Sequence, residues 1–291
     1  MANETTYTTM TDGFTIAAAV ANEQILEALH DLDHIDALTR KVDLSGIPSK
    51  SHDIGIWPRL ASASVGEGVD LAASQVNSTK ATVTASEKGL MIVPTDALNL
   101  SSLAQIMDFA REAAAAVREQ QMGDVCALAA GFSGAISNTG VNVTETNVID
   151  TIAGLANARH IGVTLRGAMY PQVWLDYVKS VGSVFTPATG PGAAGPRAAM
   201  AEFALMAGGF QRDVFGAEWY VTTAVQTANS GADSACFLVN PLRAIARGVK
   251  YESRVEVQRD ASLRATEIVV TAFDGVVEIE DSAGYGLIID R

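Results

Sequence analysis

Histidines are the first candidates for chemistry in this chain, because imidazole can bind a metal ion or transfer a proton near neutral pH. His30 and His34 lie four residues apart in HDLDHID, so a helix would place both on one face, where they could bind a metal. The segment lacks the glutamate of the HExxH motif and offers no third ligand of its own. We therefore interpret this pair as part of a solvated helix face, and His52 and His160 as structural residues.

Other catalytic motifs give no stronger signal. GFSGA around Ser133 does not have the GxSxG spacing of a hydrolase, and GPGAAG at 190–195 does not join an apolar strand to a helix. Glu278, Glu280 and Asp281 fit the polar face and the end of a strand better than a catalytic pair. We expect no enzyme, no cofactor and no metal site. The alternative is a cytosolic α+β enzyme or binding protein that uses the Gly/Pro loop at 186–197.

Composition indicates a folded, acidic protein. Of 291 residues, 48% are hydrophobic and 18% are charged, and the net charge is −13. Such a charge argues against a protein whose main task is to bind nucleic acid, which requires excess Lys and Arg. The longest early apolar run, 14–20, is too short to span a bilayer, and no export leader is visible, so we expect synthesis in the cytosol. Cys126 and Cys236 are expected to be buried thiols.

One basic cluster stands out near the C-terminus: Arg243, Arg247, Lys250, Arg254, Arg259 and Arg264. Contact with nucleic acid is one interpretation. Ion pairing with acidic groups of a neighbouring copy, with Glu67 and Asp70 as candidates, is the other. We favour pairing, because the net charge opposes general affinity for DNA and planar guanidinium groups suit such contacts.

The segment at 61–89 contains small and polar residues with several valines and threonines, which is typical of a strand pair without a core of its own. As a hairpin, each half would reach about 45 Å at 3.3 Å per residue. An isolated hairpin is marginally stable in water, so we expect it to lie on an adjacent copy. Deletion of 64–86 is then expected to leave a folded subunit that fails to assemble with other copies.

Helical periodicity covers 14–40 and, more strongly, 101–131, where Ser101 or Ser102 caps the helix and Gly131 ends it. The latter helix would be about 43 Å long. Helices and strands then alternate to about residue 248: we expect a helix capped by Asn147, a strand at 162–170, a helix that begins at Pro171, a helix at 198–207, and strands at 217–225 and 235–240. Beyond 250, YESRVEV alternates as a strand does, and Asp274-Gly275 indicates either a hairpin turn or a bulge.

This order of elements resembles the major capsid proteins of tailed phages, whose Hong Kong 97-type α+β fold is shared with encapsulin shells. The stretches that carry the resemblance are TASEKGLMIVP, GGFQRDVFGAEWYVTT and SACFLVNPLRAIARGVKYESRVEVQRDASLRATEIVVTAFDGV. The resemblance implies an N-terminal arm (1–52), an extended loop (53–94), a peripheral domain with the spine helix (95–131 and 249–291), and an axial domain (132–248).

The resemblance also implies a function. The chain would form hexamers and pentamers of an icosahedral shell around phage DNA, in a virion capsid assembled in the host cytoplasm. Portal, scaffolding and cement proteins are possible partners, and a membrane is not. An encapsulin-like compartment is the alternative. Some members cross-link a loop lysine, but we do not extend that reaction to Lys80 or Lys88. The expected inter-subunit contacts are Glu67, Asp70, Lys80, Lys88, Arg243, Arg247, Arg254 and Arg259.

Overall fold

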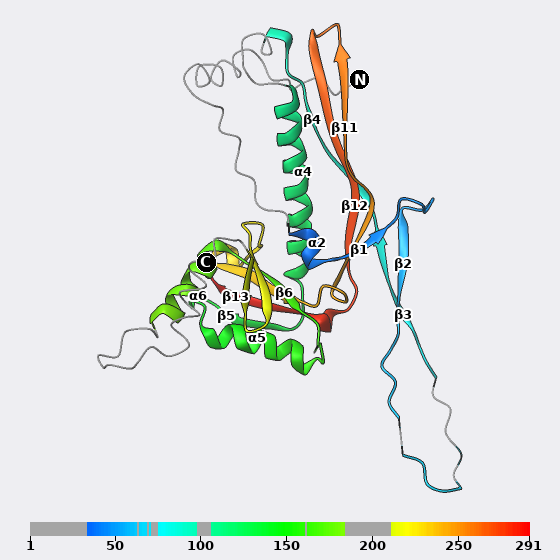
Figure 1. The fold of residues 1–291 in the computed structure, drawn as a ribbon, viewed down its shortest axis with the longest axis vertical. Helices are drawn as coiled ribbons and strands as arrows, with labels where there is room; N and C mark the ends of the chain where they lie inside the picture. The colour runs from blue at the N-terminus through cyan, green and yellow to red at the C-terminus, as the bar shows by residue number, and fades with distance from the viewer. Residues whose placement is uncertain are drawn as a thin grey trace.

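The computed structural model describes residues 34–62, 64–68, 70, 75–97, 106–160, 162–183 and 211–291. A long helix stands beside a ribbon of long strands, an α/β module lies at the foot of that helix, and a thin hairpin extends to the side (Figure 1). The expected helix at 198–207, the loop at 186–197, most of the early helix at 14–40 and His30 lie outside the described residues.

The ribbon is a four-stranded sheet in the order β1-β11-β12-β4. Its strands are β1 (Arg40–Asp43), β11 (Ile245–Asp260), β12 (Ala265–Glu278) and β4 (Ser86–Ile92). Helix α4 (Ile106–Ala129) covers one face of it (Figure 1). Ala113 and Val117 of α4 pack against Ile268, Val270 and Ala272 of β12, and these five side chains form a small core. The predicted end of this helix at Gly131 is confirmed to within two residues, and residues 101–105, with the predicted caps, lie outside the described part.

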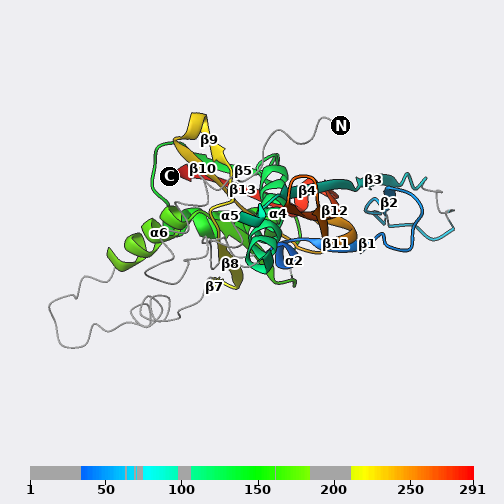
Figure 2. The same cartoon turned by 90° about the horizontal axis from the view of Figure 1, so that it is seen from above.

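The α/β module is built on a second sheet, in the order β5-β13-β10-β6-β8-β7 with β9 beside β10. Its strands are β5 (Ala135–Asn138), β6 (Leu165–Met169), β7 (Gln211–Val214), β8 (Ala217–Val221), β9 (Thr227–Ala228), β10 (Asp233–Val239) and β13 (Gly284–Asp290). Helices α5 (Glu145–Asn157) and α6 (Pro171–Ser183) lie alongside (Figure 2). Fully buried Trp219 and Phe237 lie in the main core with Leu155 of α5, so the module has its own interior. The expected strands and the helix start at Pro171 are confirmed.

Three sequence predictions in these sheets need correction. Thr144, not Asn147, caps α5, because Asn147 occupies the third helical position of a capping box in which each residue bonds the other's backbone. Asp274-Gly275 lies inside β12, so of the two alternatives given for it the hairpin turn is wrong, and the chain turns between Asp260 and Ala265. A bulge is present at this level, but its extra residue is in β11, between Val249 and Tyr251. The resemblance assigned residues 249–291 to the peripheral domain, but the last strand, β13, pairs with β10 and β5 rather than with the ribbon. A short 3-10 turn (Asp281–Ala283) precedes it, and its fully buried Leu287 and Ile289 belong to the core of the α/β module. Another 3-10 turn (Asn229–Gly231) lies before β10.

The N-terminal part that is described starts with helix α2 (Ile35–Leu38) and continues into β1, which pairs in parallel with β11. Strand geometry therefore begins at Arg40, where the sequence predicted the last residue of a helix. Ile35 and Leu38 are fully buried in the main core, so this segment is tied to both parts of the body.

The hairpin consists of β2 (Ser51–Ile56) and β3 (Thr79–Thr84), paired antiparallel from Ser51↔Thr84 to Ile56↔Thr79. The residues described between 57 and 78 form its tip, which points away from the body (Figure 1), and they contain no strand. A hairpin was predicted over 61–89. Its existence is confirmed, but its strands lie nearer the body and residues 86–92 belong to the ribbon as β4.

Candidate functional site: the projecting hairpin and the charged junction at its base

The hairpin tip exposes large apolar side chains. Trp57, directly after β2, is 79% exposed, and Leu60 is 63% exposed. Val65 and Val76 are also exposed. Single exposed apolar residues are common, but a Trp side chain offers far more apolar surface than most, and several such residues on one thin projection form a surface suited to a partner.

The base of the hairpin lies directly against the backbone of the ribbon. Gly248 of β11 and Gly275 of β12 are opposite each other in register. A Cβ atom at Gly275 would lie 2.0 Å from the carbonyl oxygen of Thr84, and one at Gly248 would lie 2.9 Å from a methyl carbon of Val83. We call the surface formed by Gly248 and Gly275 the glycine seat. Strand β3 can lie this close to the ribbon only because neither residue has a side chain. Val83 is fully buried in this seat, so β3 is anchored even though the tip is not.

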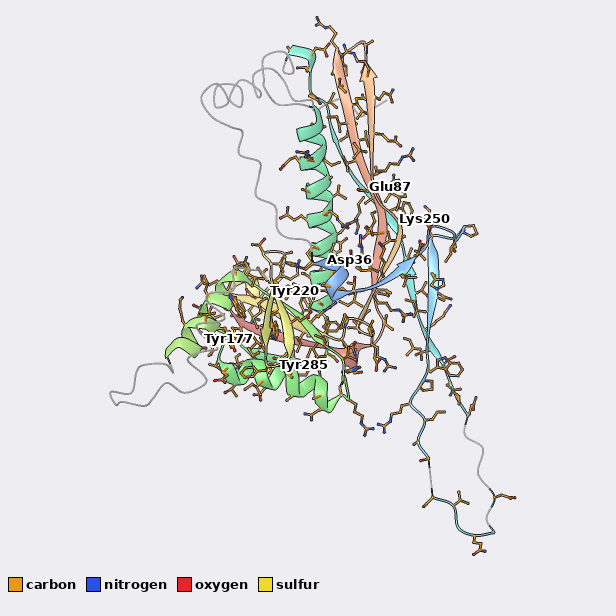
Figure 3. The ribbon with its side chains drawn as sticks, in the orientation of Figure 1. Asp36, Glu87, Tyr177, Tyr220, Lys250 and Tyr285 are labelled. Atoms are coloured by element: carbon orange, nitrogen blue, oxygen red, sulfur yellow. The ribbon has the colours of Figure 1, made fainter. Side chains whose placement is uncertain are left out.

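A cluster of charged residues occupies the opposite face of the ribbon, toward α4. We call it the charged junction, and it consists of Asp36, Lys41, Lys88, Arg118, Gln121, Asp124, Arg247, Glu252 and Asp274. Its members come from α2, β1, β4, α4, β11 and β12. Asp36 is visible beside the lower end of α4 in Figure 3. The junction therefore connects the N-terminal segment, the strand that follows the hairpin, the long helix and the ribbon.

Arg247 is the centre of the junction. Its side chain is fully buried and donates from Nε to Asp274 Oδ2 (3.3 Å) and from Nη2 to Glu252 Oε2 (2.8 Å) and Gln121 Oε1 (3.2 Å). Nη1 reaches Asp36 Oδ1 at 3.4 Å. A buried guanidinium is tolerated only when its donors are satisfied in this way. Arg247 was predicted to contact a neighbouring copy, but its side chain is fully buried inside its own chain and has no exposed surface for such a contact.

Lys88, another predicted contact residue, is also paired within the chain. Its side chain is 17% exposed and its Nζ lies 2.5 Å from Asp124 Oδ2 and 3.1 Å from Asp274 Oδ1. The buried Asp274 therefore lies between two cations, Arg247 and Lys88. Lys88 therefore links β4, the strand after the hairpin, to α4.

Glu252 connects three cations. It accepts from Arg247, from Arg118 Nη1 at 3.1 Å and from Lys41 of β1. Partial burial raises the pKa of its carboxyl, but the hydrogen bond from Lys41 and the charge of Arg247 outweigh this effect, so the pKa is lowered overall. Glu252 is therefore held as a carboxylate.

The remaining predicted contact residues lie on the surface and pair within the chain. Lys80 Nζ is 2.7 Å from Asp53, Arg243 is 3.5 Å from Glu280, Arg254 is 2.8 Å from Glu256, and Arg259 donates two bonds to Asp96 at 2.6 and 2.7 Å. Lys250, from the same basic cluster, donates to the carbonyl of Ile47 at 3.3 Å. Glu67 and Asp70 are exposed on the tip, and neither forms an ion pair with any described residue. Exposed pairs of this kind contribute little to stability.

The residues first considered for catalysis have structural surroundings. His34 is partly buried and its ring lies 4.6 Å from that of Tyr220, so for His34 the predicted solvated helix face is wrong. His160 is buried beside Asn240, Cys126 and Cys236 are free and buried, and Ser133 bonds Asp281. Within the described ranges, no group of three or more His, Cys, Asp or Glu residues is arranged to hold a metal. No helix in the same ranges is both long and apolar enough to cross a membrane.

The chain was compared with known proteins by sequence and by structure. No family model and no curated protein matches the chain by sequence. A solved structure from Mycobacterium phage Che8 is similar, with a TM-score of 0.71 and 15% identity over 91% of this chain and 94% of that one. The capsid asymmetric unit of cyanophage Pam1 has a TM-score of 0.66 and 10% identity over 100% and 98%. The chain has the fold of phage capsid proteins. The capsid of cyanophage P-SCSP1u matches this capsid fold too, with a TM-score of 0.62 and 14% identity over 91% and 90% of the two chains. The fold expected from the sequence is confirmed.

The sequence reasoning missed the charged junction as a unit. One signal was present: Arg247 stands in the apolar stretch AIARGV, where an arginine needs buried partners. Its partners are far away in sequence, so their identity was not accessible from local patterns.

Proposed function

We propose that this chain is the shell subunit of a phage capsid. The observation that carries the proposal is structural similarity along nearly the whole chain, 91% of it against 94% of a phage Che8 chain, rather than in one domain. The exposed apolar tip supports the proposal, because a projection with no core of its own gains stability when another copy covers it.

In finer detail, we propose hexamers and pentamers of an icosahedral shell that encloses double-stranded DNA of a tailed phage without sequence-specific binding. Assembly would take place in the host cytoplasm, with portal, scaffolding and cement proteins as possible partners. We retain the division into arm, extended loop, peripheral domain and axial domain as part of the proposal, with residues 284–290 moved to the axial sheet because β13 pairs there.

The proposed contacts between copies use the tip and the exposed cations. Glu67 and Asp70 would pair with Arg243, Arg254 or Arg259 of a neighbour, and Lys80 would lie in the same contact. Each arginine already has a carboxylate partner in its own chain. Because an exposed ion pair is worth only about 0–1 kcal/mol, exchange of one partner for another costs little and the contact can be adjusted during assembly. Trp57 and Leu60 would supply the apolar part of the contact.

The test is particle formation by the purified chain, followed by gel filtration and cryo-electron microscopy. We expect closed shells from the natural sequence. A compact monomer or small dimer under all conditions would contradict the proposal, and particles that retain a co-purified enzyme would indicate a compartment of the encapsulin kind instead.

A tip variant makes the test specific. The structure shows that deletion of 64–86 would remove β3 and its buried Val83, so residues 57–78 should be replaced by Asn-Gly, which closes a two-residue hairpin after Ile56. We expect this variant to fold but to form no closed shells. Trp57→Ala should reduce the particle yield because it removes the exposed aromatic surface, and Trp57→Phe should largely retain the yield because it keeps an aromatic ring. Neither substitution changes the strands of the hairpin. Normal particles from the shortened hairpin would contradict the role given to the tip.

A further inference from the structure

Strand β11 has two irregularities in its pairing with β12, one between Val249 and Tyr251 and one between Tyr251 and Arg254. At each of them the alternation of side chains between the two faces of the sheet is reversed. Val249 pairs with Asp274, but Tyr251 pairs with Phe273, so one extra residue is present in β11 between them. A second extra residue lies between Tyr251 and Arg254, which pairs with Thr271. Such bulges re-aim side chains and increase local twist.

The first bulge turns Glu252 toward α4. In a regular strand, residues five apart point to opposite faces, so Arg247 and Glu252 would be separated by the sheet. Here they bond to each other at 2.8 Å, and Glu252 also reaches Arg118 of α4. Tyr251 points to the other face, where its ring lies 5.8 Å from that of Phe273 and its hydroxyl donates to Glu87. Figure 3 shows Glu87 on the ribbon, above the base of the hairpin.

The second bulge restores the original alternation. Val255 pairs with Val270 and Val257 pairs with Ile268, and Val270 and Ile268 are buried against α4. The two irregularities therefore cancel, and only the short stretch between them is reversed. The two bulges together turn one carboxylate, that of Glu252, toward α4, and they leave the pairing next to the buried Val270 and Ile268 regular.

That carboxylate balances the junction. The acidic members are Asp36, Asp124, Glu252 and Asp274, and the basic members are Lys41, Lys88, Arg118 and Arg247, four of each sign. A continuous path of contacts runs from Lys41 in β1 through Glu252, Arg247 and Asp274 to Lys88 in β4. Lys88 follows four residues after the hairpin ends at Thr84, and β1 leads through Leu44 into the glycine seat.

We propose that the double bulge and Glu252 form a lock that holds β1 and the base of the hairpin in a fixed direction relative to α4. Glu252 acts as a positioning residue: its charge keeps the buried Arg247 compensated and ties β1 to the helix. Removal of that charge leaves an excess of cations in the junction, and partly buried like charges repel. The strands held by the junction then separate from it more often, while the second sheet, which does not contact Glu252, keeps its stability.

The experiment is hydrogen exchange, followed by mass spectrometry, on the full-length chain with Glu252→Gln, which keeps the shape and removes the charge. Glu256→Gln is the matched control, because Glu256 lies on the same strand in an exposed pair with Arg254. Wild type and both variants are compared in the same oligomeric state. We expect exchange in residues 40–43 and 79–92 to become at least about tenfold faster in Glu252→Gln and to stay unchanged in Glu256→Gln.

Residues 233–239 and 284–290 of the second sheet serve as the internal reference, and their exchange is expected to stay unchanged. If exchange in residues 40–43 and 79–92 does not change in Glu252→Gln, or rises equally in the reference strands, Glu252 is not a lock. The lock lies within one chain, so this result is independent of whether shells form, which gel filtration of the same samples reports separately.

Discussion

The seat formed by Gly248 and Gly275 gives the sharpest test of how the hairpin is held. Gly275→Ala adds one methyl group where the backbone of β3 touches the ribbon. That methyl carbon would lie 2.0 Å from the carbonyl oxygen of Thr84 and 3.1 Å from Cα of Ala85. Both neighbours are backbone atoms, so no side chain can rotate away and β3 itself must move.

The size of the effect follows from this contact. Overpacking a well-filled site costs about 1–3 kcal/mol. For a denaturant dependence near 3 kcal/mol per molar urea, this loss moves the unfolding midpoint down by about 0.3–1 M. Displacement of β3 also uncovers Val83, which is fully buried in the seat, so the upper half of this range is expected.

Gly123→Ala in α4 is the matched control. A Cβ at Gly123 would meet no atom within 4 Å outside its own helix, so the added methyl fits. Alanine in place of an interior helical glycine stabilises a helix by about 1 kcal/mol, and the urea midpoint should therefore rise. If Gly275→Ala raises the midpoint as Gly123→Ala does, β3 does not rest on the ribbon backbone and the account of the seat is wrong.

Three further predictions concern single side chains. The pKa of the Glu252 carboxyl is lowered from 4.5. The contribution of Glu252 to stability is therefore fully present above pH 4.5 and is lost as the pH falls through the lowered pKa. In urea unfolding, the stability difference between wild type and Glu252→Gln should shrink below about pH 4.5. A constant difference across this range would contradict the assignment. Burial raises the pKa of Cys236 to about 12, so this thiol should react with a thiol reagent only after unfolding, and fast reaction of the native chain would show that it is accessible. Thr144→Ala should lower the unfolding free energy by about 1 kcal/mol through loss of the α5 cap, and an unchanged urea midpoint would contradict this role of Thr144.

Much of the fold was predictable, because its signals are periodic. The apolar stripe of α4 repeats at helical spacing and packs on β12, and the mixture of helices and strands after residue 140 forms a sheet with helices beside it. The hairpin was predicted from composition alone: Thr and Val without large aliphatic residues indicate strands that cannot form a core. Composition does not specify register, so the paired residues were placed too far toward the tip.

The junction was not predictable, because each of its determinants is defined by a partner strand. An extra residue in β11 is visible only against the register of β12, since YESRVEV reads as regular alternation by itself. The first irregularity decides that Glu252 faces inward with Arg247. The second restores the regular alternation, so Arg254 faces outward, as a residue seven positions after Arg247 does in a regular strand. A basic cluster that looks uniform in the sequence is thereby divided into one buried arginine, Arg247, that organises its own chain and several exposed arginines that form ion pairs on the surface.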